Sequence, residues 1–165
     1  MIDKILMDRE KRYHQILSLL EKYHLPVICG KINYPGKHKT THEAQIAFRV
    51  LTQSIQERYA TASVFRQVLD GYDGSSMLMV VDMDPVAAKN IAVDMEEHHF
   101  LGRIFDIDVY IEDGSSIGRE KFKKGARRCV LCSEDARICM RMNRHSMESV
   151  IQEINRLIHE YESLC

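Results

Sequence analysis

The sequence predicts an α+β protein built around one antiparallel sheet, and two patterns lead to this prediction. Four stretches carry apolar residues at helical spacings, and four short runs are rich in β-branched and other apolar residues. With 165 residues, 45% of them hydrophobic, the chain can bury one core as a single domain. We expect helices over residues 3–23, 42–59, 85–98 and 146–162, and strands over residues 27–33, 62–69, 77–82 and 104–111.

A turn after the first expected strand has the composition of an anion site. A Pro-Gly pair ends at Gly36 and is followed by Lys37 and Lys39, and Thr41 is a plausible N-cap for helix 42–59. Free N–H groups and the helix dipole both attract phosphate at a helix start. The P-loop spacing is absent, so this is a candidate phosphate site of another kind.

The middle of the chain contains the expected central strand. Residues 77–82 form a continuous apolar run, which is typical of a strand buried on both faces. Asp84 and Pro85 then have the residue types of an N-cap and a first helical position, and this helix should end near His98.

The last expected strand places two carboxylates on one face. Successive side chains point to opposite faces, so Asp106 and Asp108 project together, while the apolar residues between them face the core. Neighbouring carboxylates repel each other unless a cation or basic groups lie between them. Mg²⁺, held by carboxylates and substrate phosphates, is one solution. The alternative is an amphipathic strand with a hydrated face.

The order strand–helix–strand–strand–helix–strand is that of a ferredoxin-like βαββαβ core, expected over about residues 26–112 and preceded by the N-terminal helix. In this topology the fourth strand lies antiparallel beside the first. Arg103, Asp106 and Asp108 would then lie near the turn that carries Lys39. The topology therefore predicts one site in which carboxylates and cations meet, as in a metal–polyphosphate site.

A basic, Cys/Arg-rich helical extension is expected over about residues 117–165. From residue 119 to 144 it has nine Lys or Arg against three acidic residues, whereas the net charge of the whole chain is −1. Such a segment suggests an acidic partner or a phosphorylated ligand. The basic residues that we single out are Arg119, Arg128, Arg141 and Arg144.

The same extension contains the spacing Cys129-x2-Cys132-x6-Cys139-x5-His145. Its ligand count is that of a structural Cys3His zinc site, although the spacing is not that of a common zinc finger. We expect a helix to carry both Cys139 and His145. The alternative is a set of reduced, half-buried cysteines in a short hairpin.

Several classes of protein are not expected from this sequence. The longest apolar runs are far shorter than the ~20 residues that span a bilayer, and the charged N-terminus is unlike a signal peptide. Five cysteines without an export signal favour reduced thiols in the cytoplasm. RNA-binding domains of this fold use aromatic residues on the central strands, and residues 27–33 and 77–82 contain none.

Four motifs, taken together, resemble those of a known enzyme family. It is the holo-acyl-carrier-protein synthase of citrate lyase, also called apo-citrate lyase phosphoribosyl-dephospho-CoA transferase. The resemblance runs from the helix with Asp8-Arg9-Glu10-x-Arg12 to the final helix, and Lys37-His38 replace the Pro-Val usual in the family's turn. The motifs are Pro35-Gly36-x-x-Lys39, Leu101-Gly102-Arg103-x-Phe105-Asp106-x-Asp108-Val109, Arg128-Cys129-x-Leu131-Cys132 and Cys139-x-Arg141-x-x-Arg144-His145-Ser146.

The resemblance implies a nucleotidyl transfer. The 2′-(5″-phosphoribosyl)-3′-dephospho-CoA group would pass from 2′-(5″-triphosphoribosyl)-3′-dephospho-CoA to a serine of the apo acyl-carrier (γ) subunit of citrate lyase, and pyrophosphate would leave. Asp106 and Asp108 would hold Mg²⁺ against the triphosphate, and one of them would accept the serine proton. Arg103 and Lys39, with Lys37 as an addition, would neutralise the leaving group.

Other roles and readings stay open at this point. The four arginines of the basic segment would bind the remaining phosphates or dock the carrier, since carrier domains are typically acidic. His145 is a phosphate contact, a base or a zinc ligand. Two alternative functions remain. One is the same chemistry on the malonate decarboxylase carrier, and the other is a non-catalytic zinc-binding or RNA-binding module.

Overall fold

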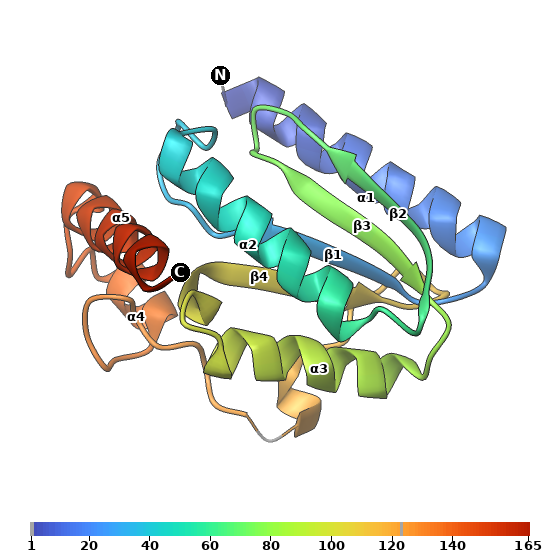
Figure 1. The fold of residues 1–165 in the computed structure, drawn as a ribbon. Helices are drawn as coiled ribbons and strands as arrows, with labels where there is room; N and C mark the ends of the chain where they lie inside the picture. The colour runs from blue at the N-terminus through green and yellow to red at the C-terminus, as the bar shows by residue number, and fades with distance from the viewer. Residues whose placement is uncertain (1, 123) are drawn as a thin grey trace.

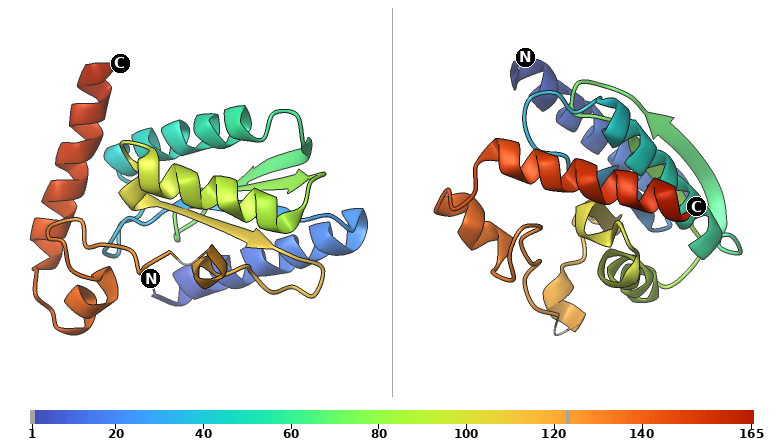
Figure 2. Two further views of the ribbon diagram at one scale, coloured as in Figure 1. Left: turned by 90° about the horizontal axis from the view of Figure 1, so that it is seen from below. Right: turned by 60° about the vertical axis from the view of Figure 1, so that its left-hand side comes forward.

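The computed structural model describes residues 2–122 and 124–165, so Lys123 of the basic segment lies outside the described residues. One antiparallel four-stranded sheet has helix α1 on one face and helices α2 and α3 on the other (Figures 1 and 2). Helix α5 stands across the end of the sheet where β4 begins (Figure 2). No helix of the described residues is both long and apolar enough to cross a membrane.

The elements follow the predicted order, and their bounds differ from the prediction by one or two residues. The helices are α1 (Ile2–Tyr23), α2 (His42–Arg58), α3 (Pro85–His98), α4 (Ala136–Arg141) and α5 (Met147–Leu164), with short 3-10 turns η1 (Gly102–Ile104) and η2 (Arg119–Phe122). The strands are β1 (Val27–Ile32), β2 (Ser63–Leu69), β3 (Ser76–Val81) and β4 (Phe105–Tyr110).

The sheet has the strand order β2-β3-β1-β4, and every neighbouring pair is antiparallel. All six residues of β3 are buried, as expected for a central strand. Strand β4 pairs with β1 from Ile32 opposite Phe105 to Val27 opposite Tyr110. The predicted pairing of the fourth strand with the first is therefore confirmed, and it is the pairing on which the convergence of the site depends.

Apolar side chains form a core on each face of the sheet. Strand β4 alternates as predicted, with Phe105, Ile107 and Val109 fully buried under α2 and α3. The opposite face packs against Ile16 and Leu20 of α1. Because helices cover both faces of β3, the central strands present no aromatic surface of the kind that RNA-binding sheets use.

Local signals placed the helix starts correctly. The side chain of Thr41 accepts a hydrogen bond from the Ala44 N–H, and that of Asp84 accepts one from the Ala87 N–H, so both are the expected N-caps. Ser146 caps α5 in the same way.

Two local expectations were wrong. Ile104 belongs to η1 rather than to the strand, because Gly102 packs so closely on the end of α3 that a Cβ there would lie 2.5 Å from the Glu96 carbonyl oxygen. The chain must turn at this point before it can extend. His145 is not on the helix of Cys139, because α4 ends at Arg141 and Asn143 adopts a left-handed φ of 46°.

Candidate active site

The candidate site is centred on Asp106 and Asp108, which share the α1 face of β4. The register places Lys31 of β1 opposite Asp106, and the Lys31 Nζ lies 2.6 Å from Asp106 Oδ2. Both carboxylates are half-buried, with side-chain exposures of 28% and 35%. They are therefore accessible to a ligand while being partly shielded from water.

Three basic side chains from three parts of the chain surround the two carboxylates. Besides Lys31, Lys89 of α3 has its Nζ 4.0 Å from Asp108 Oδ1, and Arg127 has its Nη1 3.8 Å from Asp106 Oδ1. The protein's own cations thus offset the repulsion between the carboxylates. The pair also fits the donor set of Mg²⁺, which is held by one or two carboxylates together with substrate phosphates.

The surroundings separate the pKa values of the two carboxyl groups. Burial acts to raise the pKa of Asp106, but the nearby Lys31 ammonium outweighs it and the pKa is lower than usual. Burial and the charge of Asp106 raise the pKa of Asp108 above its usual value. Asp106 therefore stays ionised more readily, and Asp108 is the carboxylate that holds a proton more readily.

Charged side chains cap the outer edge of β4, which is the last strand in the sheet order β2-β3-β1-β4. The Ile107 N–H donates to Glu96 Oε1 at 2.9 Å, and the Lys89 ammonium donates to the Ile107 carbonyl at 2.8 Å. Arg127 donates to the Phe105 carbonyl and lies 2.7 Å from Glu96. These contacts satisfy exposed strand-edge groups and fix three charges beside Asp106 and Asp108.

The residues of this edge were missed from the sequence, although a signal was present. Lys89 and Glu96 are seven residues apart, so they lie on one helical face together with the buried Ala92 and Val93. Charged residues within an apolar stripe are rarely fully buried without a partner. Arg127 was counted only as part of the basic segment.

A second charged group lies where α1 meets the turn between β2 and β3. Asp73, whose side chain is only 3% exposed, lies 3.1 Å from Arg9 and 2.8 Å from Arg12. Lys39 donates to the Tyr34 carbonyl at 2.7 Å. Burial lowers its pKa, Asp73 opposes this shift, and the charges of Arg9 and Lys31 lower the pKa further. The Lys31 charge therefore acts on Lys39 as well as on Asp106.

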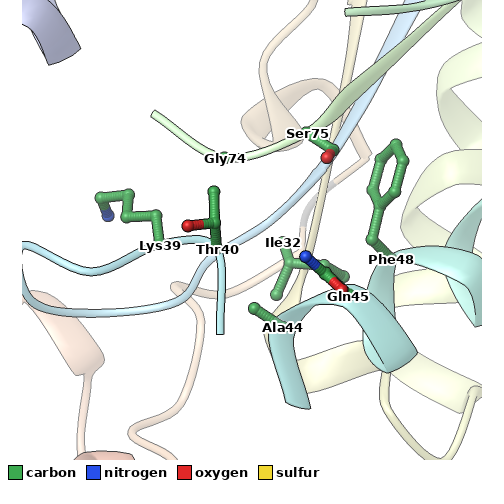
Figure 3. Close-up of a pocket in the computed structure, with 8 residues that line it drawn as sticks. All are labelled: Ile32, Lys39, Thr40, Ala44, Gln45, Phe48, Gly74 and Ser75. Atoms are coloured by element: carbon green, nitrogen blue, oxygen red, sulfur yellow. The ribbon is translucent and has the colours of Figure 1, made fainter. Parts of the chain in front are cut away.

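The turn after β1, which carries Lys37 and Lys39 and is called the lysine turn below, lies beside two hollows of different size. Lys37, Lys39 and Tyr72 line an open pocket of about 300 Å³, which is large enough for a phosphate group. Figure 3 shows the other, with the Lys39 side chain pointing away from Gln45 and Phe48. Its volume of about 10 Å³ leaves space for at most one water, so it is no substrate site.

Arginines line a pocket near β4, which measures about 360 Å³ and is called the arginine pocket below. It is formed by η1, the end of α3 and the basic segment, and Arg103, Arg119, Arg127 and Arg128 contribute to it. Arg119 is held 3.2 Å from Glu97. Because Arg127 also approaches Asp106, this pocket adjoins the carboxylate pair.

The remaining predicted residues lie in the C-terminal extension. Arg141 and Arg144 are exposed and do not line the arginine pocket. Cys129, Cys132, Cys139 and His145 converge, and within residues 2–122 and 124–165 they form the one cluster of three or more side chains suited to a metal. Arg103 donates to the Cys129 carbonyl, so the cluster is joined to η1, which directly precedes β4.

Comparison with known proteins identifies the family. The profile of the family described as apo-citrate lyase phosphoribosyl-dephospho-CoA transferase (CitX) matches residues 1–161. The chain belongs to this family. The match covers the α1 arginines, the lysine turn, Asp106 and Asp108, the arginine pocket and the cysteine cluster, so all the groups described above lie within the matched region.

Individual relatives agree with the family match. A probable apo-citrate lyase phosphoribosyl-dephospho-CoA transferase of Vibrio cholerae is 31% identical over 97% of this chain and 92% of its own length. The apo-citrate lyase phosphoribosyl-dephospho-CoA transferase of Citrobacter koseri is 26% identical over 98% and 90%. Protein CitXG of Leuconostoc mesenteroides is 27% identical over 96% of this chain but only 35% of its own length.

Proposed function

We propose that this protein transfers the phosphoribosyl-dephospho-CoA prosthetic group to the apo acyl-carrier (γ) subunit of citrate lyase. The donor would be 2′-(5″-triphosphoribosyl)-3′-dephospho-CoA. The observation that carries the proposal is membership of the transferase family over residues 1–161. The clustering of carboxylates and cations at one end of β4 supports it, because this is the composition that a triphosphate donor requires.

The reaction is a displacement at phosphorus. The serine oxygen of the carrier forms a bond to the α-phosphorus of the donor, the bond from that phosphorus to the α–β bridging oxygen breaks, and pyrophosphate leaves. The serine proton passes to a base. Negative charge grows on the leaving and equatorial oxygens, so fixed cations that contact them lower the barrier.

We assign the phosphate contacts to the two larger pockets. Arg103, Arg119, Arg127 and Arg128 of the arginine pocket would hold phosphates next to Asp106, and their charges need little rearrangement because Glu96 and Glu97 already orient two of them. Lys37 and Lys39, with Gly36 in the left-handed conformation at φ 84°, would bind another phosphate of the donor.

We further propose that Asp106 and Asp108 hold Mg²⁺ when the donor binds. The metal would supply charge neutralisation for the triphosphate. Asp108 is the better candidate for accepting the serine proton, because burial and the charge of Asp106 raise its pKa above the usual carboxyl value. Lys31 would keep Asp106 ionised throughout.

Carrier docking is assigned to the exposed surface of α4 and the residues after it. Arg141 and Arg144 lie there among exposed apolar side chains, of which Met140 is 74% and Met142 is 66% exposed. An acidic carrier would contact the arginines, and its apolar residues would contact the methionines.

The fold assignment that accompanies this function is also a proposal. The element order and the strand order β2-β3-β1-β4 support a ferredoxin-like core over residues 26–112, followed by the Cys/Arg-rich extension over residues 117–165. We place the protein in the cytoplasm, where its free cysteines would stay reduced.

A mass-shift assay on apo-carriers tests the function. The purified chain is incubated with the triphosphate donor, Mg²⁺ and either the citrate lyase carrier or the malonate decarboxylase carrier, and the intact mass of each carrier is measured. We expect the citrate lyase carrier to gain the prosthetic group and a variant lacking its acceptor serine to gain nothing. Modification of only the malonate decarboxylase carrier, or of neither, would overturn the proposal.

A further inference from the structure

The C-terminal extension brings four metal-binding side chains together from three segments. Cys129 and Cys132 come from one turn, Cys139 from α4, and His145 from the loop before α5. Their four ligand atoms all lie within 4.8 Å of one another. Cys129 and Cys139 are buried, and the other two are half-buried, so the cluster is largely closed to solvent.

The distances fit tetrahedral zinc coordination. Zinc–sulfur bonds of ~2.3 Å place neighbouring ligand atoms about 3.8 Å apart at the corners of a tetrahedron. Here Cys132 Sγ lies 3.4 Å from Cys139 Sγ and 3.3 Å from His145 Nε2. A disulfide, at about 2.0 Å, would join only two of the four groups and would leave the histidine unexplained.

The segment around the cluster buries little apolar surface that could hold it in place. Helix α4 has only six residues. Most large apolar side chains of the segment are between 36% and 74% exposed, namely Leu131, Ile138, Met140 and Met142. Small segments with so little core are commonly held by a metal or by disulfides, and the described cysteines are free.

Backbone hydrogen bonds already shape the turn as a ligand-bearing loop. The Cys129 N–H donates to the Glu134 carbonyl at 2.7 Å, and the Ala136 N–H donates to the Arg127 carbonyl at 2.8 Å. These two bonds close the turn that carries Cys129 and Cys132.

We propose that Cys129, Cys132, Cys139 and His145 bind one structural Zn²⁺. Because protein side chains fill all four positions, the ion has no open site for substrate and serves to hold the extension together. Its effect would reach the active site through two arginines. Arg103 donates to the Cys129 carbonyl, and Arg127, two residues before Cys129, contacts Glu96 and lies near Asp106.

Metal analysis of the full-length protein tests the proposal without any assay of transfer. Protein purified under reducing conditions, without chelators, should contain about one zinc ion per chain. X-ray absorption should give three sulfur ligands at ~2.3 Å and one nitrogen at ~2.0–2.1 Å. Titration of the thiols with a mercurial should release that zinc to a coloured indicator, a measurement that needs no variant.

Matched cysteine variants separate this cluster from the other thiols. Cys132→Ser should lose most of the bound zinc, whereas Cys165→Ser, at the exposed C-terminus, should retain it. The proposal would be overturned by wild-type protein that neither contains nor takes up zinc. It would also be overturned by a Cys132–Cys139 disulfide in protein purified under reducing conditions. Full zinc content in folded Cys132→Ser would overturn it as well. None of these outcomes depends on whether the carrier is modified.

Discussion

Lys31 and Asp106 lie opposite each other on β1 and β4, and their Nζ and Oδ2 atoms are 2.6 Å apart. The pairing of the two strands therefore fixes a cation beside a carboxylate before any substrate binds. The Lys31 ammonium also acts on Lys39 in the turn after β1, whose pKa it lowers, although burial is the larger cause. Its charge should control how both carboxylates titrate.

Replacing Lys31 should shift the titration of the site. In Lys31→Met, burial would act on Asp106 without the main opposing charge, so the pKa of Asp106 should rise above that of the wild type. The Asp108 carboxyl should move in the same direction, because Lys31 also lowers its pKa. If the carboxylates must be ionised, the acid limb of the pH–rate profile should move to higher pH.

Carbon-detected NMR titration of the aspartate side chains measures this shift directly. Lys22→Met, on an exposed helix surface, is the matched control and should leave both carboxyl groups unchanged. Asp106 pKa values that are equal in Lys31→Met and in the wild type would contradict the dominant role given to Lys31.

Removing either carboxylate should abolish transfer and leave the fold intact. Asp106→Asn and Asp108→Asn keep the shape of the side chain but remove the charge that would hold Mg²⁺, so we expect the rate to fall by at least about 10²-fold. The apparent affinity for Mg²⁺, from the dependence of pyrophosphate release on its concentration, should fall as well.

The control for these variants is Asp94→Asn, which removes an exposed carboxylate of α3 that pairs with Arg58. It should leave transfer unchanged, since such surface pairs contribute only about 0–1 kcal/mol to stability. Wild-type rates in Asp106→Asn or Asp108→Asn would reject the metal assignment, and a lower melting temperature would show that the loss is structural.

Charge reversal on the extension should weaken carrier binding selectively. Arg141→Glu with Arg144→Glu should raise the KM for the carrier, because an acidic partner would then meet like charge, and the KM for the triphosphate donor should stay the same. Arg137→Glu, a charge reversal elsewhere on α4, is the variant with which the double variant is compared. Steady-state kinetics with each substrate varied in turn make the distinction, and an unchanged KM for the carrier would reject this docking surface.

Local patterns predicted the fold because each pattern depends on neighbouring residues. The N-caps Thr41 and Asp84 follow from short-range hydrogen bonding, and the alternation that places Asp106 and Asp108 on one face follows from strand geometry. The pairing of β4 with β1 followed from the order of the elements. His145 was misplaced because a single left-handed residue ends α4 before it.

Most of the charged network could not be predicted in the same way. Lys89, Glu96 and Arg127 meet Asp106 and Asp108 only after α3 and the basic segment pack along the edge of β4. No local spacing relates Arg127 to Glu96, which is 31 positions earlier in the sequence. The sequence therefore identified the carboxylates of the site more readily than their partners.

The two arginines on Asp73 should contribute unequally to stability. The side chain of Arg12 is 11% exposed and that of Arg9 is 51% exposed. Arg12→Ala would leave the buried Asp73 carboxylate short of its better-shielded partner, at a cost of about 1–3 kcal/mol. Arg9→Ala should cost at most about 1 kcal/mol. Urea unfolding of both variants measures the difference, and equal losses would contradict the burial argument.

Arg127 has a structural and an electrostatic role that two variants can separate. Arg127→Ala would leave Glu96, whose side chain is 4% exposed, without its closest cation, and should destabilise the fold by about 1–3 kcal/mol. Adding Glu96→Gln removes the unpaired charge and keeps an oxygen that accepts from the Ile107 N–H, so the double variant should recover much of that stability.

The same double variant should remain slow in transfer, because no cation would then replace Arg127 beside Asp106 and in the arginine pocket. Unfolding free energies and transfer rates, measured on the same preparations, give the two roles separately. If the double variant regained the wild-type rate together with its stability, Arg127 would act only by neutralising Glu96. Stability regained without the rate would place its charge in the active site.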